Sequence, residues 1–354
     1  VGMCFIDIST GEVNLTEFSE NVEQRVINEM GRYNPTEIIL NKEVVSFNSL
    51  KDFISKKLEA SVELLIEEFE FSNAENLCKE HFNTNDLTTL SLNQRDTAVC
   101  ALGASLSYLK ATQKRDLENI KSVNFYTDAK FMNLGISAIR NLELLETMRD
   151  RDRKGSLLWV LDKTKTAMGK RLLRSWLIQP LLSPSEIIMR HNAVDEIFGD
   201  MVLRGEMTEY MTGIFDIERL MTRVVYGVAN PREIQNLARA ITRFAPLKQL
   251  LQTANCKLLK EIEADIDPLC DVAERIEQTI CDEPPISMKD GNIIREGFNA
   301  DVDMLRKDLT GGKDYIAEIE ATEKEKTGIK ALKVRYNKVF GYYIEVPAQY
   351  NDIV

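Results

Sequence analysis

The first third of the chain alternates short stretches of two-residue hydrophobic periodicity with helical stripes. The stretches "MCFIDIS" and "EVNLTEF" alternate apolar and polar residues, as half-buried strands do, and Ser9-Thr10-Gly11 between them suits a hairpin turn. Val99, Leu102 and Leu106 recur at helical spacing. The predicted elements are strands at 3–9, 12–18 and 36–40 and helices at 22–30 and 96–110. Residues 1–121 are therefore predicted to form an α/β domain.

From about residue 122 the strand signals vanish for nearly two hundred residues, and helix signals replace them. Ser183-Pro184-Ser185-Glu186 and Asn230-Pro231-Arg232-Glu233 each combine an N-cap residue, a proline at the first helical position and a glutamate at the third. The predicted buried stripe of the first of these helices is Ile187, His191, Val194 and Phe198. Gly311-Gly312 is expected to separate this irregular helical region, 122–312, from a charged helix that ends at Gly328.

The hydrophobic pattern returns to a two-residue alternation in "KVRYNKVFGYYIEV" at 333–346. Alternating aromatic and β-branched residues predict two short strands, with a bend at Asn337-Lys338. One interpretation is an ordinary small sheet whose Tyr342 and Ile344 pack inward. The other is a basic hairpin whose Lys333, Arg335, Asn337 and Lys338 donate to phosphate oxygens. The residues alone leave both open.

Composition narrows the class of protein. Of 354 residues, 44% are hydrophobic and 29% are charged, which is typical of a soluble globular protein of two or three domains. No apolar run is long enough for a membrane helix, so we expect a cytoplasmic protein. The net charge of −11 argues against a broad DNA-binding surface, so any contact with DNA must be a local patch. The start at Val1, inside a strand pattern, suggests a piece of a longer protein.

Most candidates for catalysis or metal binding have a plainer explanation. Asp7 on the first strand could belong to a metal-dependent nuclease of ribonuclease-H-like fold, but it alternates with apolar residues and is expected to face solvent. His191 lies in an apolar stripe and is expected to be hydrogen-bonded and partly buried. The pairs Gly169-Lys170 and Gly312-Lys313 lack the spacing of a phosphate loop.

A basic cluster also precedes and enters one of the predicted helices. Its members are Lys163, Lys165, Lys170, Arg171 and Arg174. Such a cluster is usually a solvated helix face, so a role in binding phosphate is the less favoured interpretation. The cysteines, six in number and without a C-x-x-C pair, are expected to be reduced thiols.

Several long motifs, in order, resemble the MutS family of DNA mismatch repair proteins. The segments "GMCFIDISTGEVNLTEF" and "ALGASLSYLKATQK" resemble that family's connector domain. "NLELLETMRDRDRKGSLLWVLDKTKTAMGKRLLRSWLIQPL", "GIFDIERLMTRV", "ANPREIQNLARAI" and "DGNIIREGFNADVDMLR" resemble its lever, or core, domain. "YNKVFGYYIEV" resembles strands of its clamp domain. The resemblance extends over essentially the whole chain.

The resemblance implies three domains and a short set of DNA contacts. Residues 1–121 would be a ribonuclease-H-like connector without nuclease activity, 122–312 a lever, and 313–354 the beginning of a clamp. Asn337 matches an asparagine of the clamp motif and is the first candidate for a contact with the DNA backbone. Lys338, Arg335 and Lys333 follow it as candidates.

The same resemblance implies partners and cofactors for the parent protein. The parent would bind mismatched duplex DNA and form a homodimer, with ATP and magnesium in an ATPase domain that these residues do not contain. The connector would dock a MutL-like protein. We therefore expect this chain to be a non-catalytic monomer that binds no cofactor and binds DNA weakly or not at all. The alternatives are the nuclease centred on Asp7 and a pure protein-interaction module.

Overall fold

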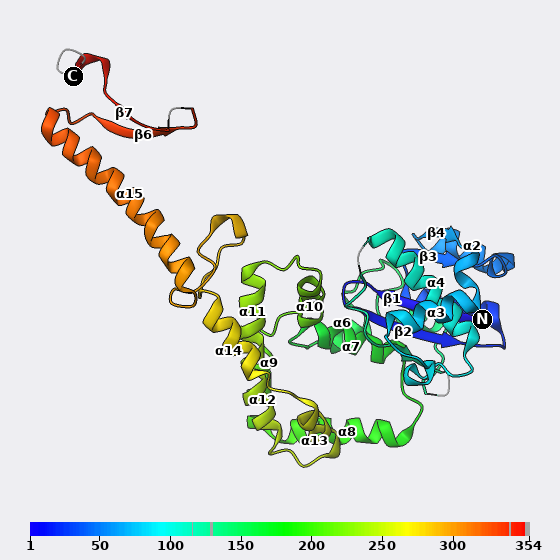
Figure 1. The fold of residues 1–354 in the computed structure, drawn as a ribbon. Helices are drawn as coiled ribbons and strands as arrows, with labels where there is room; N and C mark the ends of the chain where they lie inside the picture. Colours follow the sequence, from blue (N-terminus) through cyan, green and yellow to red (C-terminus); the bar gives the residue numbers. More distant parts are fainter. Residues whose placement is uncertain (115, 128–129, 340, 351–354) are drawn as a thin grey trace. The chain divides into compact units, whose positions relative to one another are not determined.

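The computed structural model describes residues 1–114, 116–127, 130–339 and 341–350, apart from the side chains of residues 309, 310, 313, 314 and 348. It divides into two compact units, Val1–Glu274 and Arg275–Val354. Figure 1 follows the helices and strands along the chain. Within the described residues, no helix is both long and apolar enough to cross a membrane.

A small sheet opens the first unit. Strands β1 (Gly2–Asp7) and β2 (Glu12–Glu17) are antiparallel, and the Gly11 N–H donates to the Asp7 carbonyl at 2.8 Å to close the predicted turn. Gly11 has φ of 76°, a conformation that side chains disfavour. Strand β5 (Asn124–Phe125) pairs in parallel with β2. The predicted lack of strands beyond residue 122 is therefore wrong here, because two residues are too few to show an alternation.

Helix α4 (Asp96–Gln113) packs on this sheet and α3 (Phe71–His81) packs on α4, and together they form the main core. Leu102 and Leu106 are completely buried with Leu15 of the sheet. The helices approach closely at Gly103, where an added Cβ would lie 2.4 Å from the Cα of Ala74. The hydrophobic stripe predicted for 96–110 is thus confirmed.

A second pair of strands has its own core. Strands β3 (Glu37–Leu40) and β4 (Ser61–Leu64) are parallel, with α1 (Val22–Tyr33) and α2 (Asn48–Lys57) beside them. Val26 and Met30 of α1 are buried in this core, as their spacing predicted. The short 3₁₀ helices of the chain are η1 (Val44–Ser46), η2 (Glu67–Phe69), η3 (Leu87–Leu90), η4 (Met288–Asp290) and η5 (Ala348–Tyr350).

The rest of the first unit is helical, as predicted. Its helices are α5 (Ile136–Asn141), α6 (Leu157–Leu161), α7 (Ala167–Ile178), α8 (Pro184–Gly199), α9 (Met201–Met211), α10 (Ile217–Val225), α11 (Pro231–Ile241), α12 (Phe244–Leu251) and α13 (Lys257–Asp265), with α14 (Cys270–Thr279) at the border between units. Asn230 and Glu233 form a complete capping box, with reciprocal hydrogen bonds of 3.0 and 2.8 Å. Ser183 caps α8 by accepting from the Glu186 N–H at 3.5 Å. Both predicted helix starts are confirmed.

The buried face of α8 differs from the prediction. His191 is exposed, and so are Val194 at 64% and Phe198 at 75% of their surface. The side chain that enters the local core is Ala193, with Ile197 packed beside it. The expectation of a partly buried His191 is wrong because α8 carries apolar residues on more than one face, and its contacts with α9 and α13 select the face with the smaller side chains.

The second unit holds one long helix and a hairpin (Figure 1). Helix α15 (Ala300–Thr327) runs without interruption through Gly311-Gly312, so the expected break there is wrong. An interior glycine destabilises a helix by only about 0.5–1 kcal/mol relative to alanine. The summed cost of two glycines is therefore too small to end a helix of 28 residues. Gly328 ends the helix with φ of 71°, as predicted. The domain boundaries expected at 121 and 312 remain predictions.

Candidate nucleic-acid interface

The C-terminal hairpin has two faces of different chemistry. Strands β6 (Lys333–Asn337) and β7 (Gly341–Glu345) are antiparallel. The paired positions are Lys333 with Glu345, Val334 with Ile344, Arg335 with Tyr343, Tyr336 with Tyr342 and Asn337 with Gly341. Because paired residues share a face and neighbours along a strand alternate, three of the four predicted contact residues lie on one face, here called the polar face. It comprises Lys333, Arg335, Asn337, Tyr343 and Glu345.

Asn337 uses one end of its amide to shape the turn. Its Oδ1 accepts a hydrogen bond of 2.8 Å from the Val339 N–H, which is the geometry of an Asx turn. The bend was predicted at Asn337-Lys338. Because Asn337 still pairs with Gly341, the bend begins one residue later, at Lys338. Phe340, which the predicted alternation included, lies outside the described residues. In the part of the chain that the structure covers, no group occupies the Asn337 Nδ2, so both its N–H donors are available.

Positive charge is concentrated in this segment. Residues 330–345 contain Lys330, Lys333, Arg335 and Lys338 against the single carboxylate of Glu345, which gives four minus one, or +3, in a chain of net charge −11. Arg335 Nε lies 2.6 Å from Glu345 Oε2, with both side chains about half exposed. An exposed ion pair of this kind contributes about 0–1 kcal/mol to stability, so removing Glu345 would free Arg335 for another anion without disturbing the hairpin.

The opposite face of the hairpin is aromatic and open. The rings of Tyr336 and Tyr342 meet edge to face at 5.1 Å, and each is more than 60% exposed. Ile344 is 48% exposed. The interpretation in which Tyr342 and Ile344 pack inward is therefore wrong for the described structure. The sequence pattern gave the face correctly, but it contained no signal for whether another layer covers that face.

The hairpin is anchored to α15 by a contact that the sequence did not reveal. The Val334 N–H donates to Glu320 Oε2 at 2.9 Å, and Lys324 Nζ donates to Glu320 Oε1 at 2.5 Å. Ile329 and Leu332, in the connection between helix and strand, are almost completely buried. Glu320 is one of several glutamates on a charged helix, so composition and spacing do not distinguish it.

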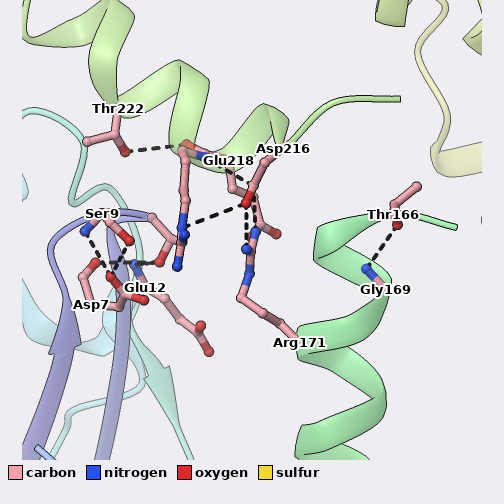
Figure 2. Close-up of polar contacts among 11 residues, drawn as sticks. Asp7, Ser9, Glu12, Thr166, Gly169, Arg171, Asp216, Glu218 and Thr222 are labelled. Carbon is pink, nitrogen blue, oxygen red and sulfur yellow. Dashed lines mark hydrogen bonds and ion pairs between the residues drawn. The ribbon is translucent and has the colours of Figure 1, made fainter. Parts of the chain in front are cut away.

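Asp7, the nuclease candidate, is exposed and stabilises a turn (Figure 2). Its Oδ1 accepts hydrogen bonds from the Ser9 N–H at 2.8 Å and the Ser9 hydroxyl at 2.6 Å. Throughout the ranges that the structure describes, no three His, Cys, Asp or Glu side chains are arranged to hold a metal ion. Nothing in the geometry favours the nuclease interpretation.

Arg171, from the basic cluster before and within α7, is committed to carboxylates (Figure 2). Its two terminal nitrogens each lie 2.7 Å from an oxygen of Asp216, and one also lies 2.5 Å from Glu218. These hydrogen bonds raise the pKa of Arg171 and hold the pKa of Asp216 below its usual value. Thr166 caps the same helix by accepting from the Gly169 N–H at 3.0 Å. Arg171 thus joins α7 to α10 and is not free to bind phosphate.

Comparison with known proteins gives one consistent family. Residues 137–344 match the family model described as MutS domain III, and residues 1–121 match MutS domain II. The first of these matches includes all four predicted contact residues.

Bacterial relatives align along nearly the whole chain. Proteins named DNA mismatch repair protein MutS from Lachnoclostridium phytofermentans and Ruminiclostridium cellulolyticum are 41% and 42% identical over 100% of the chain, which covers 38% and 40% of their own lengths. That of Alkaliphilus oremlandii is 42% identical over 98% of the chain and 40% of its own length. The chain therefore spans about 40% of the length of the curated relatives it matches.

Proposed function

Because the chain belongs to the MutS family of DNA mismatch repair proteins and carries its domains II and III, we propose that the polar face of the β6–β7 hairpin binds the backbone of duplex DNA. The observation that carries this proposal is the turn at Asn337, whose Oδ1 is occupied while its Nδ2 is available. A donor fixed by the backbone is suited to a phosphate oxygen. Lys333, Arg335 and Lys338 add charge around it.

The contact is proposed to be independent of base sequence. Phosphate contacts fix the position of a protein on the duplex and carry no direct sequence information. The described hairpin is short and exposes ammonium, guanidinium and amide donors, which suit phosphate. Its aromatic face is separated from the polar face by the plane of the strands. Mismatch recognition is accordingly assigned to other parts of the whole protein.

The test is a fluorescence-anisotropy titration of the 354-residue chain with matched and mismatched duplexes at several salt concentrations. We expect weak binding without mismatch preference. Lys338→Ala should make the slope of log affinity against log salt shallower by about 0.9. Asn337→Ala should leave the slope unchanged and weaken binding by roughly fivefold, as expected for one hydrogen bond of about 1 kcal/mol.

Lys257→Ala is the matched control, because Lys257 is an exposed lysine of the first unit whose loss gives the same change in charge. It should leave the binding almost unaltered. Absence of binding at low salt, or equal losses for Lys257→Ala and Lys338→Ala, would refute a specific role for the hairpin. A clear preference for mismatched duplex would refute the proposed division of labour.

The rest of the chain is proposed to act mechanically, without catalysis. The helical region would couple the DNA contact to an ATPase domain of the whole protein, which would bind ATP and magnesium and form a homodimer in the bacterial cytoplasm. Residues 1–121 would be a ribonuclease-H-like connector. Support for that fold comes from the antiparallel β1–β2 hairpin and the parallel strand pair that follows it.

Residues 1–121 are also proposed to dock a MutL-like protein, through β4. Ile38 and Leu40 of β3 are buried, whereas their register partners Val62 and Leu64 are 46% and 59% exposed. Paired residues share a face, so one face of this strand pair is covered over β3 and open over β4. Ile66, two residues further on, is 65% exposed. An open apolar strip of this kind is typical of a protein-binding surface.

A pull-down tests this docking surface. A MutL-like protein should retain the chain, and the double variant V62S/L64S should lose that retention. The double variant V194S/F198S removes exposed apolar side chains from α8, outside residues 1–121, and should be retained like the unaltered chain. Equal retention of all three proteins would move the docking site away from β4.

A further inference from the structure

Glu320 makes a polar contact, here called the clip, between α15 and the hairpin. The Glu320 carboxylate accepts from the backbone N–H of Val334 with one oxygen and from the ammonium of Lys324 with the other, at 2.9 and 2.5 Å. Lys324 lies one turn further along the same helix, at the spacing where helical side chains meet. Glu320 therefore links α15 to β6, the first strand of the hairpin.

The hydrogen bond goes to an otherwise free edge of the hairpin. Along an antiparallel strand, the N–H groups of neighbouring residues point alternately to opposite sides. The Val334 N–H is bound by Glu320, so this donor is directed away from β7. Its strand neighbours, Lys333 and Arg335, belong to the polar face. The clip thus holds β6 at the point where the polar face begins.

The apolar part of the joint is small. Ile329 and Leu332 are 1% and 2% exposed, whereas most positions of β6 and β7 are exposed. Two buried side chains hold the connection close to the helix but leave rotation of the strand about that connection weakly determined. A directional hydrogen bond to the backbone supplies the missing restraint.

We infer that Glu320 is a positioning residue, which fixes β6 relative to α15 so that Lys333 and Asn337 meet the DNA backbone together. This inference rests on the proposed DNA contact. It predicts a change in DNA affinity opposite to the change expected from charge alone. Glu320 is a negative charge within the joint, so simple electrostatics predicts tighter DNA binding when it is removed. A positioning role predicts weaker DNA binding for Glu320→Ala, because alanine loses the hydrogen bond to the Val334 N–H. It predicts no such loss for Glu320→Gln, because glutamine keeps an acceptor.

The experiment measures two properties of the 354-residue chain and its variants Glu320→Ala, Glu320→Gln and Glu325→Ala. The first is affinity for a matched duplex at low salt, by fluorescence anisotropy. The second is hydrogen–deuterium exchange of segment 333–336. Glu325 is an exposed glutamate of the same helix, so its replacement is the matched control for charge.

We expect Glu320→Ala to bind DNA roughly three- to tenfold more weakly, as for loss of one directional hydrogen bond, with faster exchange in segment 333–336. Glu320→Gln and Glu325→Ala should bind as well as the unaltered chain or better. Far-UV circular dichroism and unchanged exchange in α4 would show that the fold survives.

Two other outcomes of the binding experiment separate failure of the positioning role from failure of the proposed DNA contact. If Glu320→Ala binds DNA as well as the unaltered chain, or better, the positioning role is wrong while the proposed DNA contact stands. If the unaltered chain binds no DNA at low salt, the proposed contact fails and takes the positioning role with it. In that case exchange of segment 333–336 still reports whether the clip itself forms in solution.

Discussion

The ion pair between Arg335 and Glu345 allows the number of DNA contacts to be changed without altering a contact residue. Arg335 Nε lies 2.6 Å from the Glu345 carboxylate across the hairpin. Among the described residues of the hairpin, no carboxylate forms an ion pair with Lys333 or Lys338, the other cations of the turn and polar face. Replacing Glu345 by glutamine removes the competing charge and nearly preserves the shape of the side chain. The variant should therefore release Arg335 for a phosphate.

The size of the effect follows from counterion release. The slope of log affinity against log salt is about −0.9 for each phosphate neutralised, so two free lysines give about −1.8 and three free cations about −2.7. Between about 50 and 200 mM salt, these slopes correspond to losses in affinity of roughly 12-fold and 40-fold. Glu345→Gln should accordingly bind more tightly at low salt and lose affinity more steeply as salt rises.

Fluorescence-anisotropy titrations at four salt concentrations would measure both slopes. Glu325→Gln makes the same change in net charge on α15 and should keep the slope of the unaltered chain. The double variant R335A/E345Q should return to a slope near −1.8, since the released cation is absent. A slope for Glu345→Gln equal to that of the unaltered chain would refute the view that the ion pair withholds Arg335 from DNA.

Two further predictions concern stability, measured by urea unfolding. Glu196→Ala should lower the free energy of unfolding by about 1 kcal/mol, since the carboxylate holds the segment before α13 by accepting from the N–H groups of Asn255 and Cys256 at 2.6 and 2.8 Å. These hydrogen bonds, that of Asn255 first, hold the pKa of Glu196 below 4.5. Its contribution is therefore present above that pH and lost as pH falls through the lowered pKa, so the variant and the unaltered chain should converge in acid. Leu102→Ala, in the main core, should cost about 2–5 kcal/mol, whereas Leu172→Ala, at a site 53% exposed, should change stability by about 0.5 kcal/mol or less.

Turns and helix ends were predicted correctly from the sequence where they depend only on a few adjacent residues. The turn at Gly11, the capping box at Asn230 and the end of α15 at Gly328 each depend on a few adjacent residues, and all three are present in the structure. The break expected at Gly311-Gly312 is the exception. A glycine pair lowers helix propensity, but it ends a helix only where the backbone also leaves the helical conformation, and here it does not.

Burial was harder to predict than secondary structure. The spacing of Ile187, Val194 and Phe198 correctly indicated a helix, yet Val194 and Phe198 are exposed and Ala193 faces the local core. Which face of a helix is covered depends on the elements that pack against it, and in α8 those lie up to about 70 residues away, in α13. One helix's own periodicity does not contain that information.

The same limit applies to the candidate site, where the residue types could be predicted but the occupancy of their atoms could not. From the sequence, Asn337 was predicted both as a residue of the bend and as a donor to phosphate, but these two interpretations of one side chain do not say which of its atoms serves which role. In the structure Oδ1 closes the turn with the Val339 N–H, and the two Nδ2 donors remain for another partner. The two interpretations therefore reinforce each other, because the hydrogen bond that shapes the turn is also what would hold the donors in place.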